Sequence, residues 1–396
     1  MKKINIILCF IWLLCFPGKL SAQTADCETL LDEMERNNTQ LQVLRDEMEA
    51  ARLENRTGMN LSNPEVEFHY LWDMQGTKEK RKDFSIRQTV DWATLTGQKK
   101  RIRRVQDGLL ELQYRQQSIA FRLEATRTLI EWQYLRACAE EQKTRVQHAS
   151  RLVELYAVAL DKGGTTVLEV NKARLEHEMA QTAWRRTEAD IRKTEAMLQW
   201  MNGGKPLSLA SVVYVAENLP DDFAQWYAQA EQANPMLRYV KGQLELEQRQ
   251  VRKTRSENWP SLSVGYMTEK GPVEGFQGLT FGLSVPLWEN KNKLKQRKAA
   301  VKVAESRDAD AHLQFYSQVN MLYERARELA RVVADYRNAI RQDNSVSLLD
   351  KALAAGQMTV TDYYMDLSLY YDVTDRLLEA ERDYLIAVAE LQSWRW

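Results

Sequence analysis

The side chains that could carry chemistry are few and widely separated in this 396-residue sequence. The four histidines have no metal-ligand spacing among them: His69, His148, His177 and His312. Glu65, Glu67 and His69 share one face of a predicted strand, where they could bind a metal ion or simply line a water-filled space. There is no glycine-rich phosphate loop and no Gly-x-Ser-x-Gly elbow. The sequence predicts no catalytic, cofactor or metal site, and a protein that is not an enzyme.

The overall composition excludes two classes of protein. The 55 basic and 55 acidic residues give a formal net charge of zero, so a nucleic-acid partner, which would favour a basic surface, is not expected. Charged residues make up 28% of the chain and the mean hydropathy is −0.52. A polytopic helical membrane protein would be far more apolar.

The first 22 residues have the pattern of an export signal. Lys2 and Lys3 precede an apolar run, 4–16, that is too short to span a bilayer, and Leu20-Ser21-Ala22 offers a cleavage site. Cys15 raises the alternative of a lipoprotein, but the preceding Leu14 is bulkier than lipoprotein processing prefers. We therefore expect a mature chain that acts outside the inner membrane.

The mature chain repeats itself at a nearly constant offset. Three landmarks recur 196 residues apart: Asn38 and Asn234, Pro64 and Pro260, Tyr70 and Tyr266. This predicts a first repeat over 23–204, an equatorial linker over 205–233 with a short strand near 207–209, and a second repeat over 234–396. Each repeat opens with a helix, the first over 27–61 and the second over 234–258.

Each predicted repeat continues with a β-hairpin and two more helices. The first has a hairpin over 65–92, a long proline-free helix to 162 and a helix over 166–200. The second has a hairpin over 261–288, a long helix to 355 and a helix over 359–393. Glycines break the helices at Gly163-Gly164 and at Gly356, where the offset is 193.

The two hairpins alternate apolar and polar residues over lengths that suit a membrane β-strand. The candidate lipid-facing set is Val66, Phe68, Tyr70, Trp72, Phe84, Ile86, Val90, Leu262, Val264, Tyr266, Phe281, Leu283 and Val285. The candidate inward set, facing a water-filled lumen, is Glu65, Glu67, His69, Arg87 and Asp91. A soluble sheet with one buried face would alternate in the same way. Four strands cannot close a barrel, so several copies must share one: three give twelve strands and two give eight.

The order of these elements resembles that of the TolC-like outer-membrane efflux family. Asn63-Pro64 and Trp259-Pro260 resemble that family's approach to the barrel, and Phe281-Gly282-Leu283-Ser284-Val285-Pro286-Leu287-Trp288 is similar to its last strand. The resemblance implies a mainly α fold with β-structure. Long coiled-coil helices would form a periplasmic α-barrel, and a homotrimer would form a twelve-stranded barrel in the outer membrane of a Gram-negative bacterium. It also implies a passive duct, with outer-membrane lipid, a periplasmic adaptor and an inner-membrane efflux transporter as partners.

The resemblance also assigns the helix breaks to periplasmic tips that meet the adaptor. The candidate entrance and adaptor residues are Gly163, Gly164, Thr166, Glu169, Gly356, Thr359, Asp362 and Asp366. Asp362 matches one position of the family's acidic ring, whereas the second position falls at Met365, one residue before Asp366. The family's lock arginine is Met358 here, so that lock is not expected. Glu169 and Asp362 could instead serve only as helix-start residues.

Two other functions fit parts of this pattern. A periplasmic coiled-coil adaptor would share the helical hairpins, although one hairpin between soluble barrels is expected there. A type I secretion duct would share the whole architecture and differ in its pump. The sequence does not name the cargo: drugs, metal ions and peptides all fit a duct of this kind.

Overall fold

The structure is a computed structural model that describes residues 17–72, 80–210, 212–271, 273–341 and 345–396. The chain divides into two compact units. The first comprises Met1–Gln42, Ser118–Trp226 and Gln318–Trp396, and the second comprises Val43–Gln117 and Tyr227–Ser317. Each unit therefore draws on both predicted repeats.

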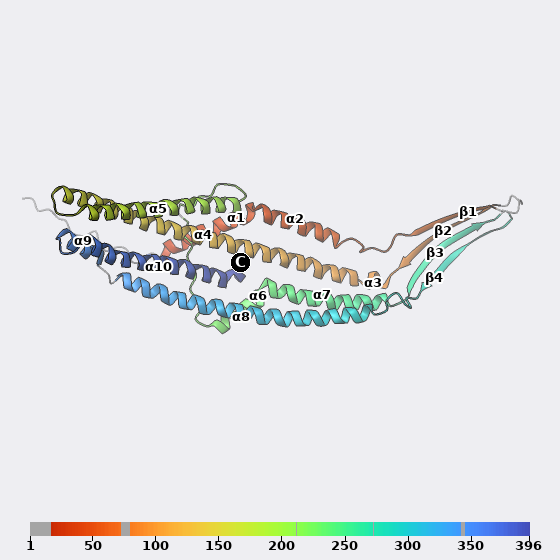
Figure 1. The fold of residues 1–396 in the computed structure, drawn as a ribbon. Coiled ribbons are helices and arrows are strands. Elements are labelled where there is room, and N and C mark those ends of the chain that lie inside the picture. Colours follow the sequence, from red (N-terminus) through yellow and green to blue (C-terminus); the bar gives the residue numbers. More distant parts are fainter. Residues whose placement is uncertain (1–16, 73–79, 211, 272, 342–344) are drawn as a thin grey trace, which may run out of the picture. The chain divides into compact units, whose positions relative to one another are not determined.

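The second unit contains one antiparallel four-stranded sheet, whose strands lie side by side in chain order (Figure 1). The strands are β1 (Glu65–Trp72), β2 (Lys80–Val90), β3 (Ser261–Lys270) and β4 (Gly275–Ser284). In the observed register Phe68 lies opposite Phe84, and Ile86 opposite both Val66 and Tyr266. Directly opposed residues point to the same face of a sheet, so the apolar positions gather on one face.

The strands are slightly shorter than the predicted hairpins for local reasons. β2 ends at Val90 because Asp91 caps the short helix α3 (Trp92–Leu95), accepting a hydrogen bond from the Thr94 amide. β4 ends at Ser284, two residues before Pro286, which has no backbone N–H to donate. The sequence also places a charged tip, 75–82, between the two strands of the first hairpin; most of it falls on 73–79, outside the described residues.

The long helices of the second unit come from α2 (Thr39–Glu54), the start of α4 (Gln98–Asp161), α7 (Pro235–Glu257) and the start of α8 (Lys293–Arg341). Asn234 caps α7 by accepting hydrogen bonds from the amides of Met236 and Leu237. α7 passes close to α4 at Gly242, where an added Cβ would lie 2.8 Å from Leu109 Cδ2. A larger residue at this position would therefore require the Leu109 side chain to shift.

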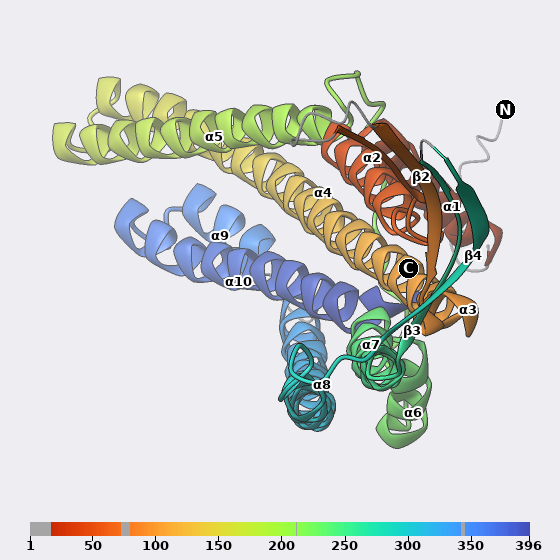
Figure 2. The ribbon, with the colours of Figure 1, turned by 90° about the vertical axis from the view of Figure 1, so that its right-hand side faces the viewer.

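The first unit packs α1 (Pro17–Asn37), the rest of α4, α5 (Val167–Met201), the end of α8, α9 (Ser345–Ala354) and α10 (Val360–Gln392). α5 runs along the C-terminal part of α4, and α9 lies beside α10 (Figures 1 and 2). One core cluster joins Met34 of α1, Leu129 of α4 and Leu198 of α5. A short 3₁₀ helix, Ser393–Arg395, follows α10. α4 is a single helix of 64 residues that ends at Asp161, one residue before the predicted end of the long helix at 162.

Four predicted elements differ from the observed ones. The predicted opening helix over 27–61 is divided at Asn38, whose side chain accepts a hydrogen bond from the Leu41 amide, and it ends at Glu54. The described part of 207–222 contains no strand: its apolar residues pack on helices, as buried Val212 does, and do not pair with another strand. The predicted linker contains a helix, α6 (Phe223–Ala233). The predicted helix to 355 is described as α8 and α9, with 342–344 outside the described residues. Of the predicted export signal, 1–16 lie outside them too.

Candidate functional site: two helix tips and a two-faced sheet

The two glycine breaks fold into the same turn. Gly163 and Gly356 both adopt left-handed φ values, 69° and 68°. After each of them, the next amide donates back to the carbonyl five residues earlier: Gly164 to Ala159 and Gln357 to Ala352. This is the hydrogen-bond pattern of a Schellman cap, and it needs glycine because other residues are strained at positive φ.

Each tip then restarts a helix with a threonine cap. Thr166 accepts a hydrogen bond from the Glu169 amide at 3.4 Å, and Thr359 accepts one from the Asp362 amide at 3.1 Å. The Thr359 hydroxyl also donates to the Asp362 carboxylate at 2.7 Å. An acidic residue in the first turn is favoured by the helix dipole as well. These contacts support the alternative role of Asp362 as a helix-start residue.

The structure brings the two tips of the first unit together. Lys172, on the first turns of α5, donates to Thr361 on α10 at 3.1 Å and lies 3.4 Å from Glu169. Lys172 was not predicted as a tip residue, because 189 residues separate it from Thr361 and its local sequence pattern is that of an ordinary exposed lysine.

Asp362 and Asp366 are four residues apart and exposed on one face of α10, since that spacing is about one helical turn. Met358, at the position of the family's lock arginine, packs against the apolar cluster of Leu152, Tyr363 and Leu367. That position thus contributes packing rather than an ion pair. Whether the two aspartates line an entrance stays a prediction.

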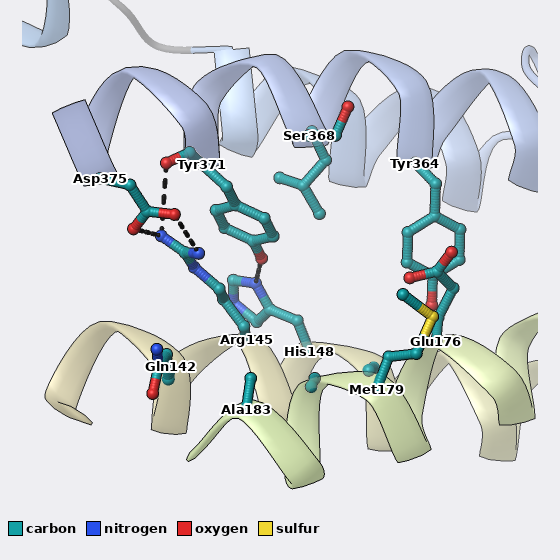
Figure 3. A pocket seen from close by; sticks show the side chains of 13 residues that line it. Gln142, Arg145, His148, Glu176, Met179, Ala183, Tyr364, Ser368, Tyr371 and Asp375 are labelled. Carbon is teal, nitrogen blue, oxygen red and sulfur yellow. Dashed lines mark hydrogen bonds and ion pairs between the residues drawn. The ribbon is translucent and has the colours of Figure 1, made fainter. Parts of the chain in front are cut away.

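A cleft of about 390 Å³ lies behind the tips, between α4, α5 and α10 (Figure 3). Across it, Arg145 of α4 makes a two-pronged ion pair with Asp375 of α10 at 2.6 and 2.9 Å, and its guanidinium lies 4.4 Å from the ring centre of Tyr371. Burial alone would lower the pKa of Arg145, but its bonds to Asp375 outweigh burial and raise it. This two-pronged ion pair ties α10 to α4.

Tyrosines complete the wall of this cleft. The Tyr371 hydroxyl is 3.0 Å from His148 Nδ1, and burial raises the Tyr371 pKa to about 12. Tyr364 faces Glu176 across the cleft (Figure 3), and burial raises its pKa too. No local sequence pattern signals this set, because its α10 members lie more than 180 residues from its members on α4 and α5.

The sheet separates the two predicted side-chain sets onto opposite faces. All the candidate lipid-facing residues within strands share one face, with Phe68 63% and Phe281 77% exposed. Val285 lies one residue beyond β4. Glu65, Glu67, His69 and Arg87 share the other face, where Glu65 and Arg87 are 4.0 Å apart.

Asp91 needs a correction. It lies outside β2, where the strand alternation had placed it facing inward, and it caps α3 while pairing with Lys99 at 3.3 Å. The hairpin was predicted too long at this end because Asp91 continues the alternation of residues, but its carboxylate serves the next element.

The sheet has two edges that pair with nothing in the described chain, one along β1 and one along β4. None of the described helices is long and apolar enough to cross a membrane. Within the same residues, no group of three or more His, Cys, Asp or Glu side chains could hold a metal ion.

The chain thus combines long helices that end in paired tips with a four-stranded sheet that has one apolar face. The chain is similar to a membrane protein from Pseudomonas aeruginosa, with 14% identity over 93% of this chain and 90% of that one, and a TM-score of 0.76. It is also similar to the CmeC outer membrane channel of Campylobacter jejuni (11% identity, 93% and 85% covered, TM-score 0.75). A third similar structure is that of the outer membrane protein VceC of Vibrio cholerae, with 10% identity over 93% of this chain and 96% of that one, and a TM-score of 0.73.

No protein-family profile and no curated protein sequence matches the chain. The structural likenesses establish the fold, which is that of the TolC-like outer-membrane efflux channels. Of these three structures, that of CmeC is described as an outer membrane channel.

Proposed function

We propose that the chain is the outer-membrane duct of a tripartite efflux system in a Gram-negative bacterium. One observation carries this proposal: the apolar face of the sheet is exposed along all four strands, and neither edge of the sheet pairs with another strand in the described part of the chain. In water such a face and such edges would favour aggregation. In a bilayer the same face meets lipid, and the edges can pair with neighbouring copies.

The dimensions of the strands agree with a membrane barrel. Ten residues, as in β3 and β4, extend about 33 Å at roughly 3.3 Å per residue. A tilt of roughly 35–45° reduces that to about 25 Å, which is the height of the apolar band in outer-membrane barrels.

Closure of the barrel sets the number of copies. Three sheets joined β4 to β1 give twelve strands, wide enough for a water-filled lumen, whereas the eight strands of a dimer enclose an interior that side chains fill. A duct needs the wider barrel, so we propose a homotrimer with Glu65, Glu67, His69 and Arg87 facing the lumen.

The proposed duct is passive and spans the outer membrane and part of the periplasm. An inner-membrane transporter supplies the energy, and a periplasmic adaptor meets the tips around Gly163–Glu169 and Gly356–Asp362. The cargo class is not assigned, and the pump could equally be of the type I secretion kind.

Membrane fractionation and planar-bilayer recording test this function together. We expect the protein to need detergent for extraction from outer membranes, to run as a trimer by native mass spectrometry and to form ion-conducting pores. A chain that is fully soluble in the periplasm and forms no pores would instead favour the periplasmic adaptor.

The proposed role of Asp362 at the entrance has its own test. Asp362→Ala is expected to weaken block by divalent cations added on the periplasmic side. Glu169→Ala, at the equivalent position of the other tip, is the matched comparison. If neither substitution changes the single-channel record, both residues are helix-start residues only.

A further inference from the structure

Three of the four connections between the sheet and the helices of the second unit are strongly basic. Residues 91–106, 249–260 and 285–304 contain fifteen lysines and arginines but only three acidic residues, Asp91, Glu257 and Glu289. Because the whole chain is neutral, the rest of it must carry the balancing negative charge. The fourth connection, 55–64, has Arg56 as its only charged residue. The positive charge is thus concentrated beside three strand ends.

These cations fall into two groups. Five are partly buried and make ion pairs at 2.5–3.8 Å within the unit: Lys99, Arg103, Arg249, Lys253 and Arg297. The other ten are exposed, and none makes an ion pair within the part of the chain that the structure describes. Three lie on α4, two on α7, four at the start of α8 and one just before α8: Lys100, Arg101, Arg104, Arg252, Arg255, Lys293, Lys295, Lys298, Lys302 and Lys291. We call these ten residues the basic collar.

The basic collar forms stripes on its helices. Lys295, Lys298 and Lys302 follow the three-four spacing of one face of α8, and Lys100 and Arg104 are one turn apart on α4. Like charges at this spacing repel and destabilise a helix. An anionic partner outside the chain would remove that cost, whereas water and salt only screen it.

The order of residue types outward from the sheet indicates where that partner lies. In each of the three connections an apolar strand end is followed first by a tryptophan and then by the cations. The tryptophans are Trp92 after β2, Trp259 before β3 and Trp288 after β4. Trp259 and Trp288 are largely exposed. Apolar strand, tryptophan and cation is the order of hydrocarbon, interface and headgroup in a bilayer.

We propose that the basic collar binds the phosphate groups of anionic phospholipids in the membrane leaflet that faces the periplasm. This inference rests on the proposed function, because it requires the sheet to lie in the outer membrane. Lys100 to Arg104 spans about 6 Å along α4 at 1.5 Å per residue. The α4 cations therefore fit within one headgroup layer, roughly 5–8 Å thick, whereas Lys293 to Lys302 covers about 14 Å along α8, so only part of that stripe lies within the layer. Each cation at such a surface raises association with anionic lipid about fivefold.

The experiment reconstitutes the full-length protein into vesicles of equal phosphatidylethanolamine and phosphatidylglycerol. The protein is then extracted in mild detergent, and the lipid that remains bound is quantified by mass spectrometry. We expect the bound phosphatidylglycerol-to-phosphatidylethanolamine ratio to exceed the bulk ratio about fivefold or more at low salt, and to fall as salt is raised. A variant with Lys293, Lys295, Lys298 and Lys302 changed to glutamine should move most of the way to the bulk ratio.

A matched variant removes four exposed, unpaired cations from α5 in the other unit: Arg174, Arg185, Arg186 and Lys193, each to glutamine. It should keep the lipid ratio of the unaltered protein.

Equal ratios in the two variants, or a bulk ratio in the unaltered protein, would overturn the inference. So would altered ion selectivity of the α8 variant with unchanged lipid binding, which would place the cations in the lumen. Lost binding to isolated peptidoglycan with unchanged lipid binding would also overturn it. A protein that does not enter vesicles at all would refute the proposed duct function, and this result differs from one in which the protein enters vesicles but shows no lipid preference.

Discussion

The ion pair between Arg145 and Asp375 should control how firmly α10 is held against α4. Asp375→Ala removes both carboxylate contacts and leaves the Arg145 guanidinium in a cleft where its side chain is only 16% exposed. We expect this substitution to loosen α10 locally while the rest of the first unit stays folded, because the apolar cluster of Leu152, Tyr363 and Leu367 is untouched.

The size of the effect follows from the burial of the two partners. A fully exposed pair contributes about 0.2–1 kcal/mol, whereas removing one partner of a buried pair costs about 3–5 kcal/mol. Asp375 is 47% exposed, so solvent screening reduces the upper figure. An intermediate cost of about 1–3 kcal/mol corresponds to a roughly 5- to 150-fold rise in local opening.

Native-state hydrogen exchange of the α10 amides measures this opening directly. The control is Asp372→Ala, because Asp372 pairs with Arg376 on the same helix at 3.5 Å and both side chains are over 60% exposed. That change should alter exchange by less than about threefold, the value of an exposed helix pair. The double variant, Arg145→Met with Asp375→Ala, should exchange its α10 amides little faster than either single variant, because both substitutions remove the same contact. Equal exchange in the Asp375 and Asp372 variants would refute the reasoning.

Three further outcomes follow from the structure. Phe68→Arg should reduce membrane assembly, since a cation on a lipid-facing strand costs about 2–4 kcal/mol at mid-depth. The control, His69→Arg on the opposite face, should assemble normally. Equal yields of assembled protein from the two variants would contradict the face assignment. Gly203→Ala should lower the midpoint of urea unfolding more than Gly204→Ala: both glycines have positive φ, but only at Gly203 would a Cβ overlap a neighbouring carbonyl. Burial raises the pKa of Cys27 to about 11, so iodoacetamide should label it at pH 9 far more slowly in the folded than in the unfolded protein, with peptide mass as the readout. Equal labelling rates would mean that the thiol is not buried.

Local sequence signals predicted the elements of the fold well. The alternation of apolar and polar residues predicted the ends of β1 to β4 to within a few residues, because every strand with one apolar face alternates with a period of two. The helix breaks were predicted from Gly163 and Gly356, and the left-handed φ at both residues is the physical reason. Errors fell where two signals compete, as at Asp91, which fits both a strand alternation and a helix cap.

The contacts between elements were not predictable in the same way. Arg145 and Asp375 are 230 residues apart, and each lies on a helix face that also carries ordinary exposed charges. Only the packing of α10 on α4 distinguishes this pair from the many surface pairs of the chain. Candidate residues read from the tip motif were therefore incomplete, because they omitted Lys172 and the whole wall of the cleft.

The two tips have the same turn but differ in a side chain that contacts the neighbouring tip. Positions related by the offset of 193 pair Gly163 with Gly356 and Thr166 with Thr359, so the turns themselves are conserved between the copies. The same offset relates Lys172 to Met365, which has no hydrogen-bond donor. Lys172 can therefore bridge to the second tip, but the second tip cannot return the contact. The two tips share one backbone but present different side chains, so a partner that meets both must recognise two distinct surfaces.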